Sequence, residues 1–399
     1  MAIAPHIKEA MSGSSFIRKM FEDGIQLKKK FGEDNVYDFS LGNPDLEPPE
    51  GVITAIKEEA ASDVKGSHGY MPNPGYPETR AAIAKKISLE QNKQVSGDDI
   101  VMSVGAAGAL NCVFKAILSP GDEVIVPAPF FVEYRSYAAN HGGKLIPVPT
   151  NDDFSLNIAE IKKALSEKTA AVLINSPNNP TGKVYSDDDI IMLSDTLTAH
   201  GESCGRKPYL IADEPYRAII YKDLHVAPVF QYYEDAIVVS SFAKDFSLPG
   251  ERLGYIAVNP ACNSAADVIA ACGYATRVLG YVNAPAFFQR VIARCWDAKA
   301  DYSSYVNRRN SLTAVLKKAG IPYAEPEGAF YLFCKVPERT VTEGELTAGA
   351  FCDHLKKYNI LGVPGAGFGK EGWFRLAYCV SEKTIVNSEA AFCKARKEW

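Results

Sequence analysis

The chain has 399 residues, which is more than one hydrophobic core usually serves, so two domains are expected. Its 47% hydrophobic and 23% charged residues are typical of an ordinary soluble globular protein. A net charge of -5 gives no electrostatic reason to expect nucleic acid or an anionic membrane as a partner.

The nine cysteines form no Cys-x-x-Cys pair and no regular spacing with histidine, so neither a metal site nor a disulfide framework is indicated. Charged residues between Lys8 and Arg18 stand where a signal peptide would lie, and we therefore expect a reducing cytoplasm as the location. The longest apolar stretch, residues 101–118, is interrupted by Ser103, Asn111 and Lys115. It therefore fits a strand, a glycine turn and a buried helix better than a membrane span.

In chain order, the first predicted elements are a helix from Ser15 to Lys30 and an extended arm ending in Leu41-Gly42-Asn43-Pro44. From residue 100 onward, short β-rich runs alternate with amphipathic stretches of helical length, such as residues 158–165 and residues 187–200 after the N-cap Ser186. The predicted strands are Ile100–Val104, Glu123–Pro127, Lys144–Val148, Ala170–Asn175, Tyr209–Asp213, Ala236–Ser240 and Leu253–Val258.

This alternation predicts an α/β fold with a mostly parallel seven-stranded sheet covered by helices on both faces. After about Pro285 the pattern changes to a long helical stretch through Arg309, and strands follow near Ala329–Lys335 and Trp373–Ala377. We therefore predict a large domain of residues 46–288. Residues 1–45 and 289–399 together form a smaller, discontinuous α+β domain.

Three strand ends carry unusual residues, and ligands bind beyond the carboxyl ends of the strands in such sheets. The motifs are Asn175-Ser-Pro-Asn-Asn179-Pro-Thr-Gly182, Asp213-Glu214-Pro215-Tyr216 and Ser240-Ser241-Phe-Ala-Lys244, the last followed closely by Gly250-Glu-Arg252-Leu-Gly254-Tyr255. Each motif alone is more often a turn, a cap or a surface lysine. Together, in order and at one edge of one sheet, they predict a single ligand site.

The chemistry of these residues fits an aldehyde cofactor with a pyridine ring and a phosphate. A lysine at a buried strand end can lose its proton and form an imine, and an aspartate can pair with a protonated pyridine nitrogen. A tyrosine and an asparagine can hydrogen-bond the ring hydroxyl. Arg252, Ser241 and the amides of Gly105-Ala106-Ala107-Gly108, a turn before a helix expected to begin near Ala109, can hold the phosphate.

At this point the chain resembles the fold-type I, class I/II aminotransferases, which use pyridoxal 5′-phosphate. The resemblance runs from Leu41-Gly-Asn-Pro-Asp45 to Trp373-Phe-Arg-Leu-Ala377, and Ser-Phe-Ala-Lys244 with Gly-x-Arg252-x-Gly-Tyr is its most specific part. It implies that Lys244 carries the cofactor as a Schiff base and acts in catalysis with Asp213 and Tyr216. The cofactor-binding residues that it implies are Lys244, Asp213, Tyr216, Asn179, Ser241, Arg252, Ala106, Ala107, Phe131 and Tyr70.

The resemblance also implies the substrate-binding residues Arg375, Gly42, Asn179 and Arg277. Arg375 would grip the substrate α-carboxylate, and Gly42 would let the substrate approach closely because it lacks a Cβ atom. Tyr70 would reach the cofactor phosphate of a partner subunit. A homodimer with shared active sites is therefore expected.

The substrate signals are mixed. Some aspartate-specific members have a lysine where this chain has Ala107, and the segment Ser15-Phe-Ile-Arg18-Lys resembles members that act on aromatic amino acids. Arg277 lies 33 residues after Lys244, near the position of an arginine that reads a distal carboxylate in the neighbouring subunit. The alternative interpretation of Arg277 is a helix-end arginine that pairs with a surface acid or lies along the surface.

The implied activity is transfer of an amino group from an L-amino acid, of aspartate or aromatic type, to a 2-oxo acid such as 2-oxoglutarate. The mechanism would be of the ping-pong type. One alternative is a carbon–sulfur β-lyase of the same fold, which would release pyruvate and ammonia from cystathionine without an oxo acid. A more remote alternative is a non-enzymatic regulator, but about 45 residues before the large domain leave no room for a winged-helix module.

Overall fold

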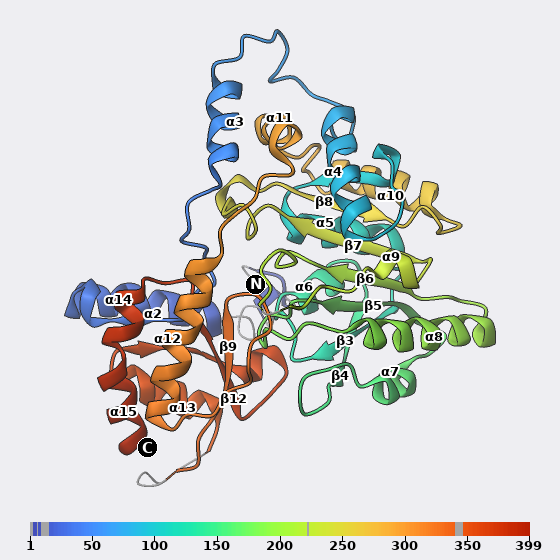
Figure 1. Cartoon of the computed structure of the whole chain (residues 1–399). Coiled ribbons are helices and arrows are strands. Elements are labelled where there is room, and N and C mark those ends of the chain that lie inside the picture. The colour runs from blue at the N-terminus through green and yellow to red at the C-terminus, as the bar shows by residue number, and fades with distance from the viewer. Residues whose placement is uncertain (1–2, 6, 9–15, 222, 340–345) are drawn as a thin grey trace.

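The computed structural model describes residues 3–5, 7–8, 16–221, 223–339 and 346–399. Two sheets organise this part of the chain, and they lie beside each other in Figure 1. The larger sheet has seven strands in the order β2-β8-β7-β6-β5-β3-β4. Its strands are β2 (Ile100–Ser103), β3 (Glu123–Ala128), β4 (Lys144–Pro149), β5 (Thr169–Asn175), β6 (Tyr209–Asp213), β7 (Ala236–Ser241) and β8 (Gly254–Val258).

These seven strands confirm the seven predicted strands, with ends that differ by one residue or so. Pairing is parallel from β4 through β3, β5 and β6 to β7, and only β8 runs antiparallel to its neighbours β7 and β2. The predicted mostly parallel sheet is therefore confirmed.

Helices cover both faces of this sheet, which explains why its central strands are apolar throughout. Successive residues of β6 point to opposite faces: Leu210 joins the core under α4, α8 and α11, whereas Ile211 joins the core under α5 and α10. The helices of this part are α3 (Glu50–Ala60), α4 (Pro77–Glu90), α5 (Gly105–Ile117), α6 (Tyr134–Ala139), α7 (Ile158–Ala164), α8 (Asp187–Cys204), α9 (Val229–Tyr232), α10 (Ala265–Val278) and α11 (Ala286–Cys295).

The start of α5 differs from the prediction. The helix begins at Gly105 and not near Ala109, so the predicted turn is itself the first helical turn. Gly105 has φ +68°, a left-handed conformation that reverses the chain directly after β2 and leaves no need for a longer connection. The amides of Ala106 and Ala107 consequently belong to a helix N-terminus.

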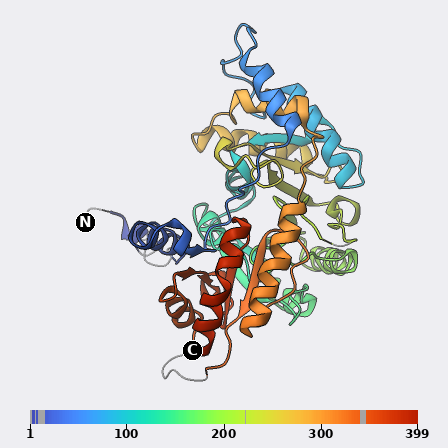
Figure 2. The same ribbon diagram turned by 60° about the vertical axis from the view of Figure 1, so that its left-hand side comes forward.

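The smaller sheet has the antiparallel order β11-β12-β9, with β9 at Tyr331–Lys335, β11 at Val363–Pro364 and β12 at Trp373–Ala377. The strands β1 (Tyr37–Asp38) and β10 (Ile360–Leu361) form a separate parallel pair that joins the N-terminal arm to the C-terminal part. Around these strands lie α2 (Phe16–Phe31), α12 (Ser303–Ala319), α13 (Ala348–Lys356), α14 (Glu382–Asn387) and α15 (Glu389–Lys397). Figure 2 shows α2, in dark blue, at the side of this C-terminal part.

The predicted helical stretch after Pro285 is broken into α11 and α12. The break follows from Asp301, whose carboxylate accepts hydrogen bonds from the backbone N–H and the hydroxyl of Ser303. Such a local side-chain bond competes with the helical backbone bond and starts a new helix instead. The domain boundary predicted after residue 288 falls inside α11, which packs against α3 and α4.

The remaining short elements are the 3-10 helices η1 (Glu33–Asn35), η2 (Gly97–Asp99), η3 (Pro249–Glu251) and η4 (Gly365–Phe368). The predicted N-terminal helix begins at Phe16 in the structure, and Ser15 lies outside the described residues. Within the described part of the chain, we find no helix with the length and apolar character needed to span a bilayer.

Candidate active site

The three predicted motifs meet at the carboxyl edge of the large sheet. Asn175, at the end of β5, is in register with Asp213 at the end of β6, and Asp213 is in turn in register with Val239 of β7. A cavity of about 210 Å³ opens at this edge. Nine of the predicted site residues line it: Ala106, Ala107, Phe131, Asn179, Asp213, Tyr216, Ser241, Lys244 and Arg252.

Lys244 carries the only amine among the residues that line this cavity. Its Nζ atom donates a hydrogen bond to the carbonyl oxygen of Gly42 at 2.7 Å and lies 5.5 Å from the ring centre of Phe330. Burial of the ammonium lowers the pKa of Lys244 to about 8, and the positive charges of Arg375 and Arg252 act in the same direction. A neutral amine, which is the nucleophilic form, is therefore accessible near neutral pH.

Asp213 is the acid of the cavity and is only 6% exposed. Its Oδ2 atom accepts a short hydrogen bond from the Tyr134 hydroxyl, whereas its Oδ1 atom is buried and has no hydrogen-bond partner in the described part of the chain. Burial raises the pKa of Asp213 to about 7, against the lowering effect of the Tyr134 hydrogen bond. A buried acceptor without a partner is costly, so the site favours a ligand that offers a donor or a positive charge at this point.

The groups at the opposite end of the cavity can bind an anion. The first N–H groups of α5, at Gly105, Ala106 and Ala107, have no partner within the helix, and the positive end of the helix dipole lies there. A Cβ atom at Gly105 would lie 2.7 Å from Arg252 Nη2, so only glycine leaves room for this guanidinium. Arg252 is held by a hydrogen bond from Nη1 to the carbonyl oxygen of Pro249 at 2.9 Å, and the buried Ser241 lines the same cavity.

Arg375 enters the site from the small sheet and is 3% exposed. Its Nη1 atom donates to Asn179 Oδ1 at 3.0 Å and its Nη2 atom to the carbonyl oxygen of Ser40 at 2.7 Å. The guanidinium lies 4.6 Å from the ring centre of Tyr331, whose hydroxyl is 2.9 Å from that of Tyr216. The Nε atom of Arg375 is buried and finds no hydrogen-bond partner among the residues that the structure describes. These contacts bring the arginine to the predicted cofactor residues.

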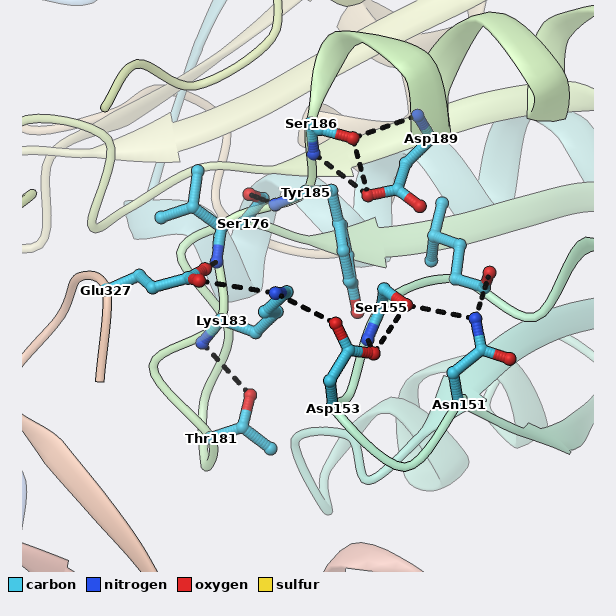
Figure 3. A network of polar contacts seen from close by, with 12 residues as sticks. Asn151, Asp153, Ser155, Ser176, Thr181, Lys183, Tyr185, Ser186, Asp189 and Glu327 are labelled. Atoms are coloured by element: carbon cyan, nitrogen blue, oxygen red, sulfur yellow. Dashed lines mark hydrogen bonds and ion pairs between the residues drawn. The ribbon is translucent and has the colours of Figure 1, made fainter. Parts of the chain in front are cut away.

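The loop that carries Asn179 is fixed by a polar network. Asn175 Oδ1 accepts the backbone N–H of Asn179 at 2.7 Å. Beyond the loop, Lys183 Nζ binds Asp153 at 3.3 Å and Glu327 at 3.2 Å, as Figure 3 shows. Glu327 precedes β9, so this network joins the loop at the large sheet to the segment that leads into the small sheet.

Gly42 lies next to Lys244 and Tyr331. A Cβ atom at Gly42 would overlap the hydroxyl group of Tyr331, so this tyrosine requires the absence of a side chain. The sequence predicts that a substrate approaches Gly42 closely. In the structure, the group that lies close to Gly42 is the Tyr331 side chain of the protein itself.

Four predicted residues do not line the cavity: Arg375 and Gly42 contact residues that line it, whereas Tyr70 and Arg277 lie elsewhere on the chain. Tyr70 lies between α3 and α4 and is 92% exposed. Arg277 is exposed in the last turn of α10, where its guanidinium lies 5.3 Å from the ring centre of Tyr274 and borders a surface groove beside Asn73 and Pro74.

The motifs do not reveal several residues of the site. Tyr134 and Tyr137 line the cavity, and Tyr331 bridges Tyr216 and Arg375. Tyrosines in apolar segments are equally typical of a core, so residue type alone does not single them out. Spacing is the one usable signal. Tyr134 and Tyr137 follow Phe131 by three and six residues, and this spacing places all three side chains near one face of a helix start.

The fold and this cavity are those expected of an enzyme, and the comparisons identify the family of the chain. A match to the family described as aminotransferase class I and II covers residues 34–388. The aspartate aminotransferase of Pyrococcus abyssi is 33% identical over 96% of each chain, and that of Thermotoga maritima is 34% identical over 90% of each. The crystal structure of an aminotransferase from Eubacterium rectale superposes with a TM-score of 0.94 at 38% identity, covering 100% of this chain and 99% of that one.

The chain therefore belongs to the aminotransferase class I and II family and is a transaminase. The predicted family and enzyme class are confirmed.

Proposed function

We propose that the cavity binds pyridoxal 5′-phosphate, and that the enzyme moves an amino group from an L-amino acid, of aspartate or aromatic type, to a 2-oxo acid such as 2-oxoglutarate. One observation carries the proposal: a lysine of lowered pKa and a buried aspartate oxygen without a partner line the same cavity. An anion-binding helix start lies at its other end. These groups fit an aldehyde, a pyridine nitrogen and a phosphate.

Each predicted cofactor residue has a role in this proposal. Lys244 would hold the aldehyde carbon covalently, and Asp213 would hold a proton at the pyridine nitrogen through its free Oδ1 atom. Tyr216 and Asn179 would bind the ring oxygen, and Phe131 would cover one ring face. The phosphate would be held by Arg252, Ser241 and the backbone N–H groups of Ala106 and Ala107.

When bound, this cofactor supplies an aldehyde that condenses with amines and a ring that withdraws electrons from the substrate Cα atom. The residues of the chain supply substrate orientation and proton transfer. Arg375 would orient the substrate by binding its α-carboxylate. Lys244 Nζ, once the substrate amine has replaced it on the cofactor, would take the proton from Cα and deliver it to the former aldehyde carbon. Asp213 would keep the ring nitrogen protonated.

Tyr70 supports a homodimer with shared active sites. A tyrosine that is 92% exposed in a structured connection is a candidate for burial by a partner, and we propose that it reaches the cofactor phosphate of the second subunit. We also propose the division into a large domain of residues 46–288 and a small domain of residues 1–45 and 289–399.

The test of the proposed function is a half-reaction screen. The holoenzyme is mixed with each amino acid in turn, and the absorbance of the bound cofactor is followed. We expect a change with a small set of amino acids and continuous turnover only after a 2-oxo acid is added. Release of pyruvate and ammonia from cystathionine without an oxo acid would instead establish the carbon–sulfur β-lyase alternative.

Arg277 stays a prediction that depends on the second subunit. If its guanidinium binds the distal carboxylate of a substrate in the partner's site, Arg277→Ala will lower kcat/KM for aspartate and leave phenylalanine almost unchanged. The expected selective loss is about tenfold to hundredfold. Arg80→Ala, a variant of another arginine that borders the same surface groove, is the control. Equal small losses with both substrates would assign Arg277 to the surface.

A further inference from the structure

Glu133 lies in the segment that forms one wall of the cavity. Phe131 and Tyr134 on either side of it line the cavity, and so does Tyr137 one helical turn later. The backbone N–H of Tyr137 bonds to the carbonyl oxygen of Glu133 at 2.9 Å, so the two side chains share one face of the start of α6. This acid is not among the predicted site residues.

The same segment packs against the part of the chain that supplies Arg375. The backbone N–H of Phe130 donates to the carbonyl oxygen of Phe368 at 3.0 Å, and the Arg375 guanidinium lies 5.0 Å from the ring centre of Phe368. Arg375 is also the positive charge that acts on Glu133: it lowers the pKa of this acid, while the larger effect of burial raises it. The charges of Glu133 and Arg375 therefore act on each other where these two segments pack together.

Glu133 has an unused acceptor at this place. Its Oε2 atom is buried and has no hydrogen-bond partner among the described residues. Arg375 donates no hydrogen bond to it: its Nη1 and Nη2 atoms bind Asn179 and Ser40, and its Nε atom has no hydrogen-bond partner among the described residues. A buried acceptor without a donor destabilises the site, so a ligand that brings an N–H or O–H group is favoured there and a ligand that brings a second carboxylate is disfavoured.

We propose that Glu133 recognises the side chain of the substrate. It accepts a hydrogen bond from a neutral, hydrogen-bond-donating side chain, such as a carboxamide or a hydroxyl group, of an amino acid held through Arg375. It repels a side-chain carboxylate. This inference rests on the proposed function and narrows it: of the two proposed substrate types, aspartate is disfavoured and a hydroxyl-bearing aromatic side chain is favoured. It also opposes the role predicted for Arg277.

The test compares amino acids of equal shape. Glutamine and asparagine carry a donor where glutamate and aspartate carry a charge, so the ratio of kcat/KM for amide over acid isolates the effect of Glu133. Glu133→Gln removes the negative charge and keeps the size of the side chain. We expect the ratio to fall by about tenfold or more in this variant. Glu167→Gln, which changes an exposed acid, is the matched control and should leave the ratio as in the wild type.

A binding measurement makes the result independent of turnover. Dissociation constants of succinate and of its monoamide, succinamate, are measured with the wild-type and variant holoenzymes by titration calorimetry. Succinate should bind more tightly to Glu133→Gln than to the wild type, relative to succinamate. A merely structural role would weaken both compounds alike.

The outcomes separate the two proposals. If the wild type converts amino acids and both ratios are the same in Glu133→Gln as in the wild type, this inference is wrong and the proposed function stands. If the wild-type holoenzyme converts none of the amino acids, the proposed function is wrong and the inference is wrong with it.

Discussion

Lys244→Ala is expected to lower kcat by about 10⁴-fold or more, because the variant loses both the amine that holds the cofactor and the base that moves the Cα proton. Borohydride treatment of the wild-type holoenzyme should fix the cofactor to the peptide that contains Lys244, as mass mapping would show. The variant should give no such adduct. Lys162→Ala, a variant of an exposed lysine, is the control and should behave as the wild type.

The lowered pKa adds a pH dependence to this prediction. Because burial brings the pKa of Lys244 to about 8, the neutral amine forms as the pH rises through about 8. An ordinary lysine needs a pH near 10.5. Attachment of pyridoxal phosphate to the cofactor-free protein, trapped with borohydride at a series of pH values, should therefore rise with a midpoint near 8 at Lys244. Trapping at another lysine would remove Lys244 from the proposed role.

Asp213→Ala is expected to have the second largest effect, a fall in kcat of about 10²- to 10³-fold. The free Oδ1 atom is the group that would hold a proton at the ring nitrogen, and alanine cannot replace it. Cofactor binding should persist, since the phosphate is held by other residues, and its absorbance would report occupancy. Near-normal turnover would mean that another acid serves the ring nitrogen, and Glu214 would be the next candidate.

Tyr134→Phe tests the same acid by a smaller change than Asp213→Ala. The hydroxyl of Tyr134 donates to Asp213 Oδ2 and lowers the pKa of the acid, so its removal should raise that pKa further above about 7. If the ionised carboxylate is the active form, the acid limb of the kcat/KM profile should move to higher pH. Tyr137→Phe, in the same cavity but without a bond to Asp213, is the control. An unshifted profile in Tyr134→Phe would show that the hydrogen bond does not tune the acid.

The order of the strands and their motifs could be predicted because both are local in sequence. Apolar runs such as Val172–Ile174 and Ile237–Val239 fit only buried strands, and parallel strands bring their carboxyl ends to one edge. Asp213 and Lys244 therefore had to meet near the same place. The start of α5 was misplaced because a single left-handed glycine can end a strand and open a helix at once, which spacing does not reveal.

Contacts between distant segments were decided only by the tertiary structure. Asn179 and Arg375 are 196 residues apart, and their hydrogen bond forms because the small sheet packs over the edge of the large one. Tyr134 and Asp213 are 79 residues apart, and their hydrogen bond also forms only in the folded chain. Folding brings Gly42 and Tyr331 together in the same way. The unpartnered oxygen of Glu133 is likewise invisible in the sequence. The sequence by itself determined which residues can do the chemistry, since residue type and strand order are local. Only packing, which depends on the whole chain, decided which charges are paired and which remain free for a substrate.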